Sequence, residues 1–163
     1  MGARPAPVEP DPATSNIDPV RLAGATTPRT RAIMPVHPYG QACRMPEIMQ
    51  VARKHGLHVV EDNAQTQGAA FGVQLTGSSG ALNATSFYHG KNLGPLGDAG
   101  GLTTADAGLA AQVRTLRNYG SARKYHNDFI GYNSCLDELQ AAVLRIKLGY
   151  LQAWTAQRQV LAA

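Results

Sequence analysis

Residues 86–94 read SFYHGKNLG, and they place one lysine, Lys91, in a glycine-flanked turn directly after a short apolar strand. Upstream, residues 57–62 read LHVVED, an apolar run that ends in two carboxylates. Pyridoxal 5'-phosphate (PLP) requires an amine for its aldehyde carbon and a carboxylate against its ring nitrogen. The two segments therefore indicate a PLP site with Lys91 and Asp62 as candidates, although a lysine after a strand is by itself more often a solvated surface charge.

The surrounding sequence predicts alternating strands and helices. A strand over residues 32–37 precedes an amphipathic helix whose apolar stripe begins at Met45 and which Gly56 is suited to end. The apolar run at residues 57–61 follows at once, and its continuous character is typical of a strand buried in a parallel sheet. Together these elements make a βαβ unit.

The second half of the chain continues the pattern. Short strands are expected at residues 84–88 and 101–104, on either side of the Lys91 turn. Asp106 is suited to cap a following helix, and Ser134 with Asp137 forms a capping-box pattern for one long last helix that reaches Trp154. The whole sequence predicts a layered α/β domain.

Five short sequence blocks add to the indication of a PLP site that Lys91 and Asp62 give. They are VHPYGQ at 36–41, EDNAQ at 61–65, SFYHGKNLG at 86–94, GDAGG at 97–101 and GYNS at 131–134. In this order they resemble the DegT/DnrJ/StrS family of PLP-dependent sugar aminotransferases, over about residues 8–158. The resemblance implies an α/β, three-layer fold with a mostly parallel sheet, the aspartate-aminotransferase-like large domain of PLP-dependent transferases, here incomplete.

The resemblance also implies roles for five residues. Lys91 would bind the cofactor covalently and move the proton between substrate and cofactor, and Asp62 would bind the ring nitrogen. Gln65 matches the residue beside the cofactor ring, and Ser86 matches the hydroxyl that binds the cofactor phosphate. Asn133 matches a residue that reaches the phosphate of a neighbouring subunit, which implies a homodimer with shared sites. Dehydratases of the family carry histidine in place of Lys91, so a lysine favours transamination.

By the same resemblance, the expected activity is transfer of an amino group to a keto-sugar nucleotide, with glutamate as the expected amino-acid donor, in sugar, cell-surface or antibiotic biosynthesis. The alternative is a catalytically silent truncated remnant or an interaction subunit of such an enzyme. A nucleotide-binding α/β module is a weaker alternative, because no strand is followed by a Gly-x-Gly-x-x-Gly turn.

Composition limits the other classes of function. The chain has 163 residues and a net charge of +4, but its basic residues are scattered and form no motif of a nucleic-acid binder. No apolar run is long enough for a membrane helix. No spacing among the histidines and acids suggests a metal site. Cys43 and Cys135 lie far apart in the sequence, which fits a reducing cytoplasm better than a disulfide framework.

Two domain segments are expected. Residues 1–30 are rich in proline, threonine and aspartate and are expected to form an irregular N-terminal arm. Residues 31–163 are expected to form a partial PLP-binding large domain, because complete members of the family are much longer. The sequence therefore predicts a chain that is truncated at both ends.

Overall fold

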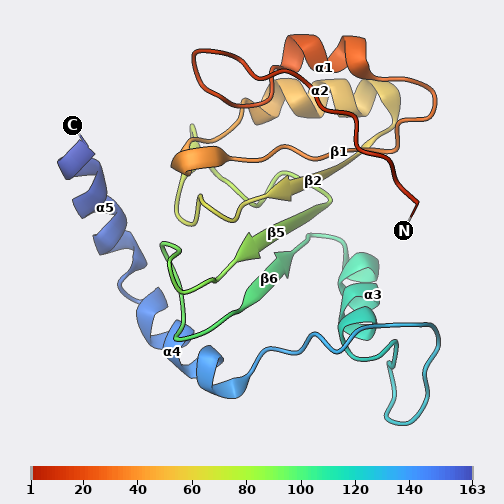
Figure 1. Cartoon of the computed structure of the whole chain (residues 1–163), viewed down its shortest axis with the longest axis vertical. Helices are drawn as coiled ribbons and strands as arrows, with labels where there is room; N and C mark the ends of the chain where they lie inside the picture. Colours follow the sequence, from red (N-terminus) through yellow and green to blue (C-terminus); the bar gives the residue numbers. More distant parts are fainter. Residues whose placement is uncertain (1, 163) are drawn as a thin grey trace. The chain divides into compact units, whose positions relative to one another are not determined.

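The computed structural model of the chain describes residues 2–162 and divides into two compact units, Met1–Thr85 and Ser86–Ala163 (Figure 1). Parallel strands form the centre of the first unit. Strand β2 (His58–Asp62) pairs with β1 (Ala32–Ile33) along one edge and with β5 (Leu82–Ser86) along the other. An isolated parallel bridge between Val36 and Asp62 extends the first pairing to the end of β2.

Helix α2 (Met45–His55) supplies the apolar face that covers these strands. Pro46 is tolerated in its first turn, and Gly56 ends it in the left-handed conformation at φ 62°. The buried core of this unit consists of Leu22, Ile33, Cys43, Met45, Ile48, Ala52 and Val59. The predicted βαβ unit is confirmed, although β1 is shorter than residues 32–37.

The first thirty residues are more ordered than expected. Helix α1 (Pro19–Ala25) begins after Asp18, whose side chain accepts a hydrogen bond from the Val20 N–H. Leu22 of this helix is buried in the core, and Val8 and Ile17 pack against the same cluster. The prediction of an irregular arm is therefore wrong for α1, because apolar side chains anchor the segment. The domain division at residue 30 stays a prediction.

A small hairpin follows β2 and was not predicted. Strands β3 (Ala70–Phe71) and β4 (Gln74–Leu75) pair in antiparallel fashion across Gly72, whose φ is 60°. A single 3-10 turn, η1 (Pro38–Gly40), lies between β1 and α2. Strands of two residues carry too little periodicity to be recognised from sequence.

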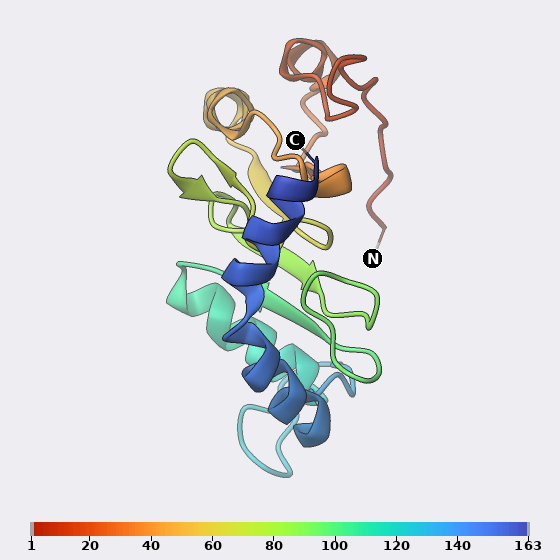
Figure 2. The same ribbon diagram turned by 90° about the vertical axis from the view of Figure 1, so that its left-hand side faces the viewer.

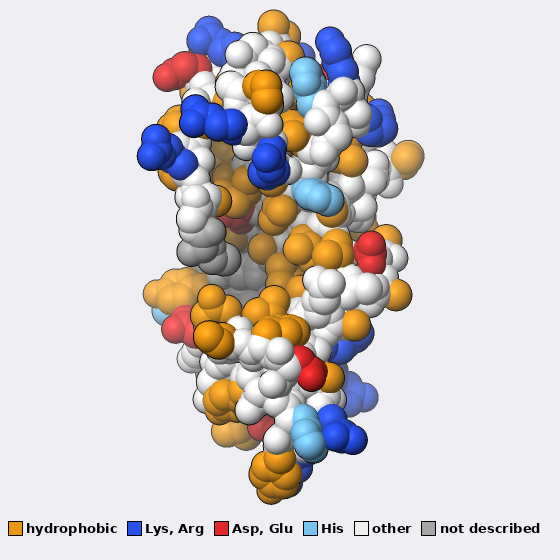
Figure 3. Space-filling view, turned by 90° about the vertical axis from the view of Figure 1, so that its right-hand side faces the viewer, with side chains coloured by type: hydrophobic (Ala, Val, Ile, Leu, Met, Phe, Trp, Pro, Cys, Tyr) orange, Lys and Arg blue, Asp and Glu red, His pale blue; other side chains and the backbone are white. Residues whose placement is uncertain are grey.

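The second unit contains strand β6 (Gly100–Thr103) and three helices. Helix α3 (Ala107–Arg117) begins at its predicted cap, since the Asp106 carboxylate accepts the Leu109 N–H at 2.9 Å. Helices α4 (Glu138–Leu148) and α5 (Leu151–Ala162) occupy the end of the chain (Figure 2). Hydrophobic and charged side chains are interspersed on the face of the molecule in Figure 3.

Two expectations about the last helix are wrong. Asp137 is the N-cap of α4, whereas Ser134 donates its backbone N–H to the Arg117 carbonyl and belongs to the preceding loop. The single long helix is also interrupted at Gly149. There the Tyr150 N–H bonds the carbonyl of Lys147, three residues back, so the regular hydrogen-bond ladder breaks at a residue of low helix propensity.

Candidate cofactor site

Asp62 is the last residue of β2, at the carboxyl end of a parallel strand, where open α/β sheets place their ligands. Its backbone is held on both sides. The Asp62 N–H donates to the Pro35 carbonyl at 2.9 Å, and the Asp62 carbonyl accepts from the His37 N–H at 3.2 Å. The half-buried carboxylate accepts the Ala64 N–H through Oδ1 at 3.0 Å. The side chain is therefore tied into the turn that follows the strand.

Gln65 lies in the same turn. Its Oε1 accepts the backbone N–H of Tyr39 at 2.9 Å. Tyr39 has a left-handed φ of 58°, and Gly40 beside it has a φ of 84°. The amide of Gln65 thus connects the turn after β2 to the η1 segment. The first unit brings Asp62 and Gln65 together on one short turn.

Glu61 is fully buried and has a different environment from its neighbour Asp62. Its Oε1 accepts the N–H groups of Ser79 and Gly80, both at 2.6 Å. Its Oε2 accepts the Gly77 N–H at 2.9 Å and lies 3.0 Å from Nε2 of His37. Burial opposes the charged form, but the hydrogen bonds from His37 and from the three backbone N–H groups lower the pKa of Glu61 below its ordinary value. Glu61 thus anchors the loop at residues 77–80.

His37 completes this buried cluster. Its Nδ1 accepts the Cys43 N–H at 3.0 Å, so the ring proton is on Nε2 and is donated to Glu61. His37 thus links the Cys43 backbone to the Glu61 carboxylate.

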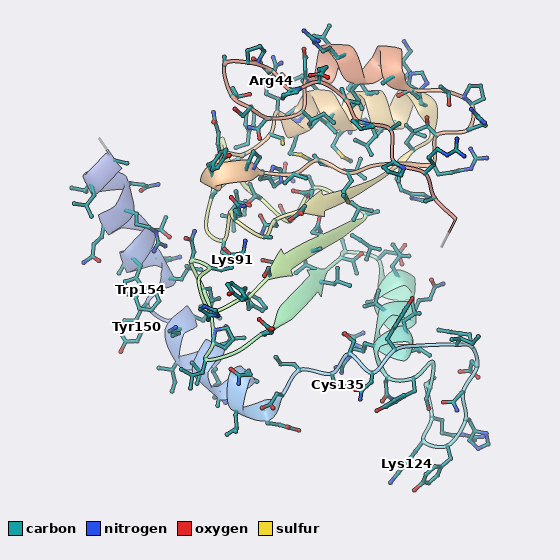
Figure 4. All side chains as sticks on the ribbon, in the orientation of Figure 1. Arg44, Lys91, Lys124, Cys135, Tyr150 and Trp154 are labelled. Carbon is teal, nitrogen blue, oxygen red and sulfur yellow. The ribbon has the colours of Figure 1, made fainter. Side chains whose placement is uncertain are left out.

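Lys91 lies in the loop that follows β5 (Figure 4). The Lys91 N–H donates to the Tyr88 carbonyl at 2.8 Å, which closes a tight turn. The Phe87 N–H donates to the Ala99 carbonyl at 2.8 Å and joins the two ends of the loop. Ser86 accepts the Tyr88 N–H on its Oγ at 3.2 Å. Ser86 and Lys91 therefore belong to one hydrogen-bonded loop of the second unit.

Asn133 lies on another segment of the second unit. It forms an isolated antiparallel bridge with Asn118 at the end of α3, and its side chain is exposed. Between them, the Tyr119 N–H donates to the Tyr132 carbonyl at 2.8 Å and so closes the base of a long loop. The assembly of all five candidates into one site stays a prediction.

The residues present fit the chemistry of PLP. The two units supply an amine on a closed loop, a carboxylate at a strand end and hydroxyl and amide side chains. Within residues 2–162, no group of histidine, cysteine and acidic side chains could hold a metal ion. None of the helices in the described part of the chain has the length and apolar character needed to cross a bilayer.

The first unit is a parallel α/β unit with a carboxylate at a strand end, and the second carries a lysine on a hydrogen-bonded loop. The model of the DegT/DnrJ/EryC1/StrS aminotransferase family matches residues 1–163, and the chain belongs to this family.

Two of the relatives are named as transaminases that act on dTDP-linked sugars. The chain is 49% identical over 162 residues to dTDP-3-amino-3,4,6-trideoxy-alpha-D-glucose transaminase of Streptomyces venezuelae, a match that covers 99% of the chain and 43% of the relative. It is 53% identical to dTDP-3-amino-3,6-dideoxy-alpha-D-galactopyranose transaminase of Aneurinibacillus thermoaerophilus, covering 99% of the chain and 45% of the relative. The chain thus spans less than half the length of these relatives.

Solved structures give the same result. The crystal structure of S. venezuelae DesV in complex with a ketimine intermediate superposes with a TM-score of 0.96 at 49% identity, covering 99% of this chain and 43% of that chain. The structure of ntda from Bacillus subtilis with bound cofactor PMP gives a TM-score of 0.83 at 34% identity, covering 88% of this chain and 33% of that chain. The expected family and the incomplete α/β fold are confirmed.

Proposed function

We propose that the chain is the cofactor-binding part of a PLP-dependent aminotransferase that moves an amino group from an amino acid, with glutamate as the proposed donor, to a keto-sugar nucleotide. The product would serve sugar, cell-surface or antibiotic biosynthesis. The observation that carries the proposal is Lys91 on a loop closed by backbone hydrogen bonds, in a chain of this family. The names of the sugar-nucleotide transaminases support the substrate class.

PLP, when bound, withdraws electrons from the carbon that carries the amino group. Lys91 has a primary amine, which can attack a carbonyl carbon when it is neutral and can accept a proton afterwards. Lys91 is therefore the proposed nucleophile and proton carrier.

Asp62 is the proposed partner of the ring nitrogen. The hydrogen bonds to Pro35 and His37 fix its backbone, so the carboxylate stays at the strand end. A fixed negative charge there favours a protonated ring nitrogen over a neutral one. Gln65 is proposed to lie beside the cofactor ring, held by its bond to the Tyr39 N–H.

Ser86 and Asn133 are the proposed phosphate ligands. A hydroxyl and an amide can both donate hydrogen bonds to phosphate oxygens. Asn133 is proposed to act on the phosphate of a second copy of the chain, so the enzyme would be a homodimer with shared sites. Its exposed side chain supports this role.

We propose a cytoplasmic location and no nucleic-acid or membrane partner. Both cysteines, Cys43 and Cys135, are free thiols, which supports a reducing compartment. We also retain the proposal that residues 31–163 form part of the large PLP-binding domain.

Borohydride reduction of the PLP-treated chain, followed by peptide mapping, tests this function. The expected result is a pyridoxyl group on Lys91 and its absence in the Lys91→Ala variant. A label on Lys54, Lys124 or Lys147 instead would contradict the site. Absence of any label would favour the silent or interaction-subunit alternative.

A further inference from the structure

Helix α4 contacts the final part of the loop that carries Lys91, and these contacts come from side chains outside the five candidates. Gln140 accepts the N–H groups of Leu96 and Gly97 on its Oε1, both at 3.0 Å. Lys147 donates from its Nζ to the Gly94 carbonyl at 2.6 Å. The two side chains are about two helical turns apart, so they project from the same face of α4.

The segment that α4 contacts, residues 94–97, begins close to the backbone of the residues just before Lys91. Leu93 is 6% exposed, and Gly94 is also buried. A Cβ at Gly94 would lie 2.6 Å from the carbonyl oxygens of Tyr88 and His89. The Tyr88 carbonyl also accepts the Lys91 N–H. Movement of Gly94 would therefore disturb the turn that contains Lys91.

The chemistry of the two contacts is specific. One side-chain oxygen satisfies two consecutive backbone N–H groups, which an apolar side chain cannot do. Lys147 is half-buried, and no carboxylate in residues 2–162 pairs with its ammonium. A hydrogen bond from a charged donor to a carbonyl is stronger than a neutral one. The Lys147 ammonium therefore donates a hydrogen bond to the loop and is not simply a solvated surface charge.

We propose that Gln140 and Lys147 are positioning residues that hold residues 94–97 and thereby fix where the loop presents the Lys91 amine. This role rests on the proposed function of Lys91 as the residue that binds PLP. Helix α4 would then contribute to the site through these two side chains, in addition to its packing in the domain.

Paired substitutions separate the hydrogen bonds from the side-chain volume. Gln140→Leu removes the acceptor, whereas Gln140→Glu keeps an oxygen for the Leu96 and Gly97 N–H groups. Lys147→Met removes the donor, whereas Lys147→Arg keeps one. Matched controls are Gln152→Leu, on the exposed surface of α5, and Arg145→Met, at an exposed position of α4.

Amide hydrogen exchange of the 163-residue chain without PLP is the first measurement. Gln140→Leu is expected to speed exchange at the Leu96 and Gly97 amides by about tenfold, the effect of one lost hydrogen bond. Gln140→Leu and Lys147→Met are both expected to speed exchange at the Lys91 amide. The Gln140→Glu, Lys147→Arg and control variants should match the wild type. Unchanged exchange at Lys91 in both disruptive variants would overturn the proposal.

The second measurement is the distribution of borohydride-fixed PLP among lysines. Gln140→Leu and Lys147→Met should lower the label on Lys91 relative to Lys54 and Lys124, and the conservative variants should restore it. A general loss of stability would not change this ratio in the same way. Altered exchange with an unchanged ratio would make the contacts merely structural and overturn the positioning role.

If the wild-type chain carries no label on Lys91, the proposed function fails, and the role toward PLP fails with it. Amide exchange would in that case still report whether α4 holds the loop. The two failures are therefore distinguishable.

Discussion

Glu61→Gln is expected to destabilise the first unit strongly, because the substitution changes only the hydrogen-bonding character of a fully buried group. The carboxylate accepts four hydrogen bonds, two on each oxygen. Glutamine keeps one oxygen for two of the donors and presents an NH2 group to the other two. The Gly80 N–H keeps a second acceptor, Oδ1 of Asn83 at 3.0 Å, so one or two donors lose their acceptor, depending on which side the NH2 group faces. At about 1–3 kcal/mol for each, the expected loss is about 1–6 kcal/mol.

The histidine cannot relieve this mismatch. If His37 moved its ring proton to Nδ1, its Nε2 could accept from the new side-chain amide, but Nδ1 would then no longer accept the Cys43 N–H. One unsatisfied buried donor would be exchanged for another. A change of tautomer therefore does not remove the loss.

Denaturant unfolding of the 163-residue chain measures this loss. The control is Glu9→Gln, an exposed glutamate whose change is expected to stay within about 0.5 kcal/mol. A loss of less than about 1 kcal/mol for Glu61→Gln would refute the inference that the four hydrogen bonds stabilise the fold.

The pH dependence gives an independent check. The pKa of Glu61 in the folded state lies below its ordinary value of 4.5. The stabilisation is therefore fully present above pH 4.5 and is lost as the pH falls through the folded pKa. The difference in unfolding free energy between wild type and Glu61→Gln should shrink below pH 4.5. A constant difference between pH 7 and pH 3 would contradict the assignment of the charge.

Three further predictions follow from the site and its surroundings. Asp62→Asn is expected to keep PLP on Lys91 but to lower the rate of the glutamate half-reaction by more than about tenfold, because an amide cannot hold the ring nitrogen protonated; equal rates would place the nitrogen partner elsewhere. Burial raises the pKa of Cys43 to about 11, so iodoacetamide at pH 8 should label the exposed Cys135 much faster, as peptide mapping would show, and equal labelling would contradict the buried position. Gly94→Ala is expected to cost more than about 1 kcal/mol in denaturant unfolding, because a Cβ there would lie 2.6 Å from backbone oxygens, whereas Gly24→Ala, where the space is open, is the control.

The sequence predicted those parts of the fold that local patterns specify. The apolar stripe and glycine stop of α2, and the Asp106 cap of α3, appear where they were expected. The interruption at Gly149 was missed, because the apolar positions on both sides continue one helical pattern. Helix α1 was missed because its proline-rich flanks suggested an irregular segment, while the burial of Leu22 depends on contacts distant in sequence.

The candidate site was predictable only in part. The lysine loop and the carboxylate at the end of β2 follow from local patterns, and the five sequence blocks identified the other candidates by resemblance. The roles of Gln140 and Lys147 could not be read from the sequence, because a glutamine and a lysine on a helix are ordinary surface residues. Only the fold brings their polar atoms to the backbone of residues 94–97.

The neighbouring carboxylates of Glu61 and Asp62 on β2 require opposite environments, one buried among hydrogen-bond donors and one accessible. Because successive side chains of a strand point to opposite faces, one strand provides both environments. Glu61 is charged but buried, so its charge is stable only because four donors surround it. Those donors belong to His37 and to the loop at residues 77–80, and they hold the end of the strand in place. Asp62, on the other side, is half-buried and accepts one hydrogen bond from its own turn. If the two environments were exchanged, the anchoring carboxylate would lack its hydrogen-bond donors, and the carboxylate that is proposed to bind the cofactor would be inaccessible to it. The order Glu-Asp is therefore itself a requirement of the proposed site.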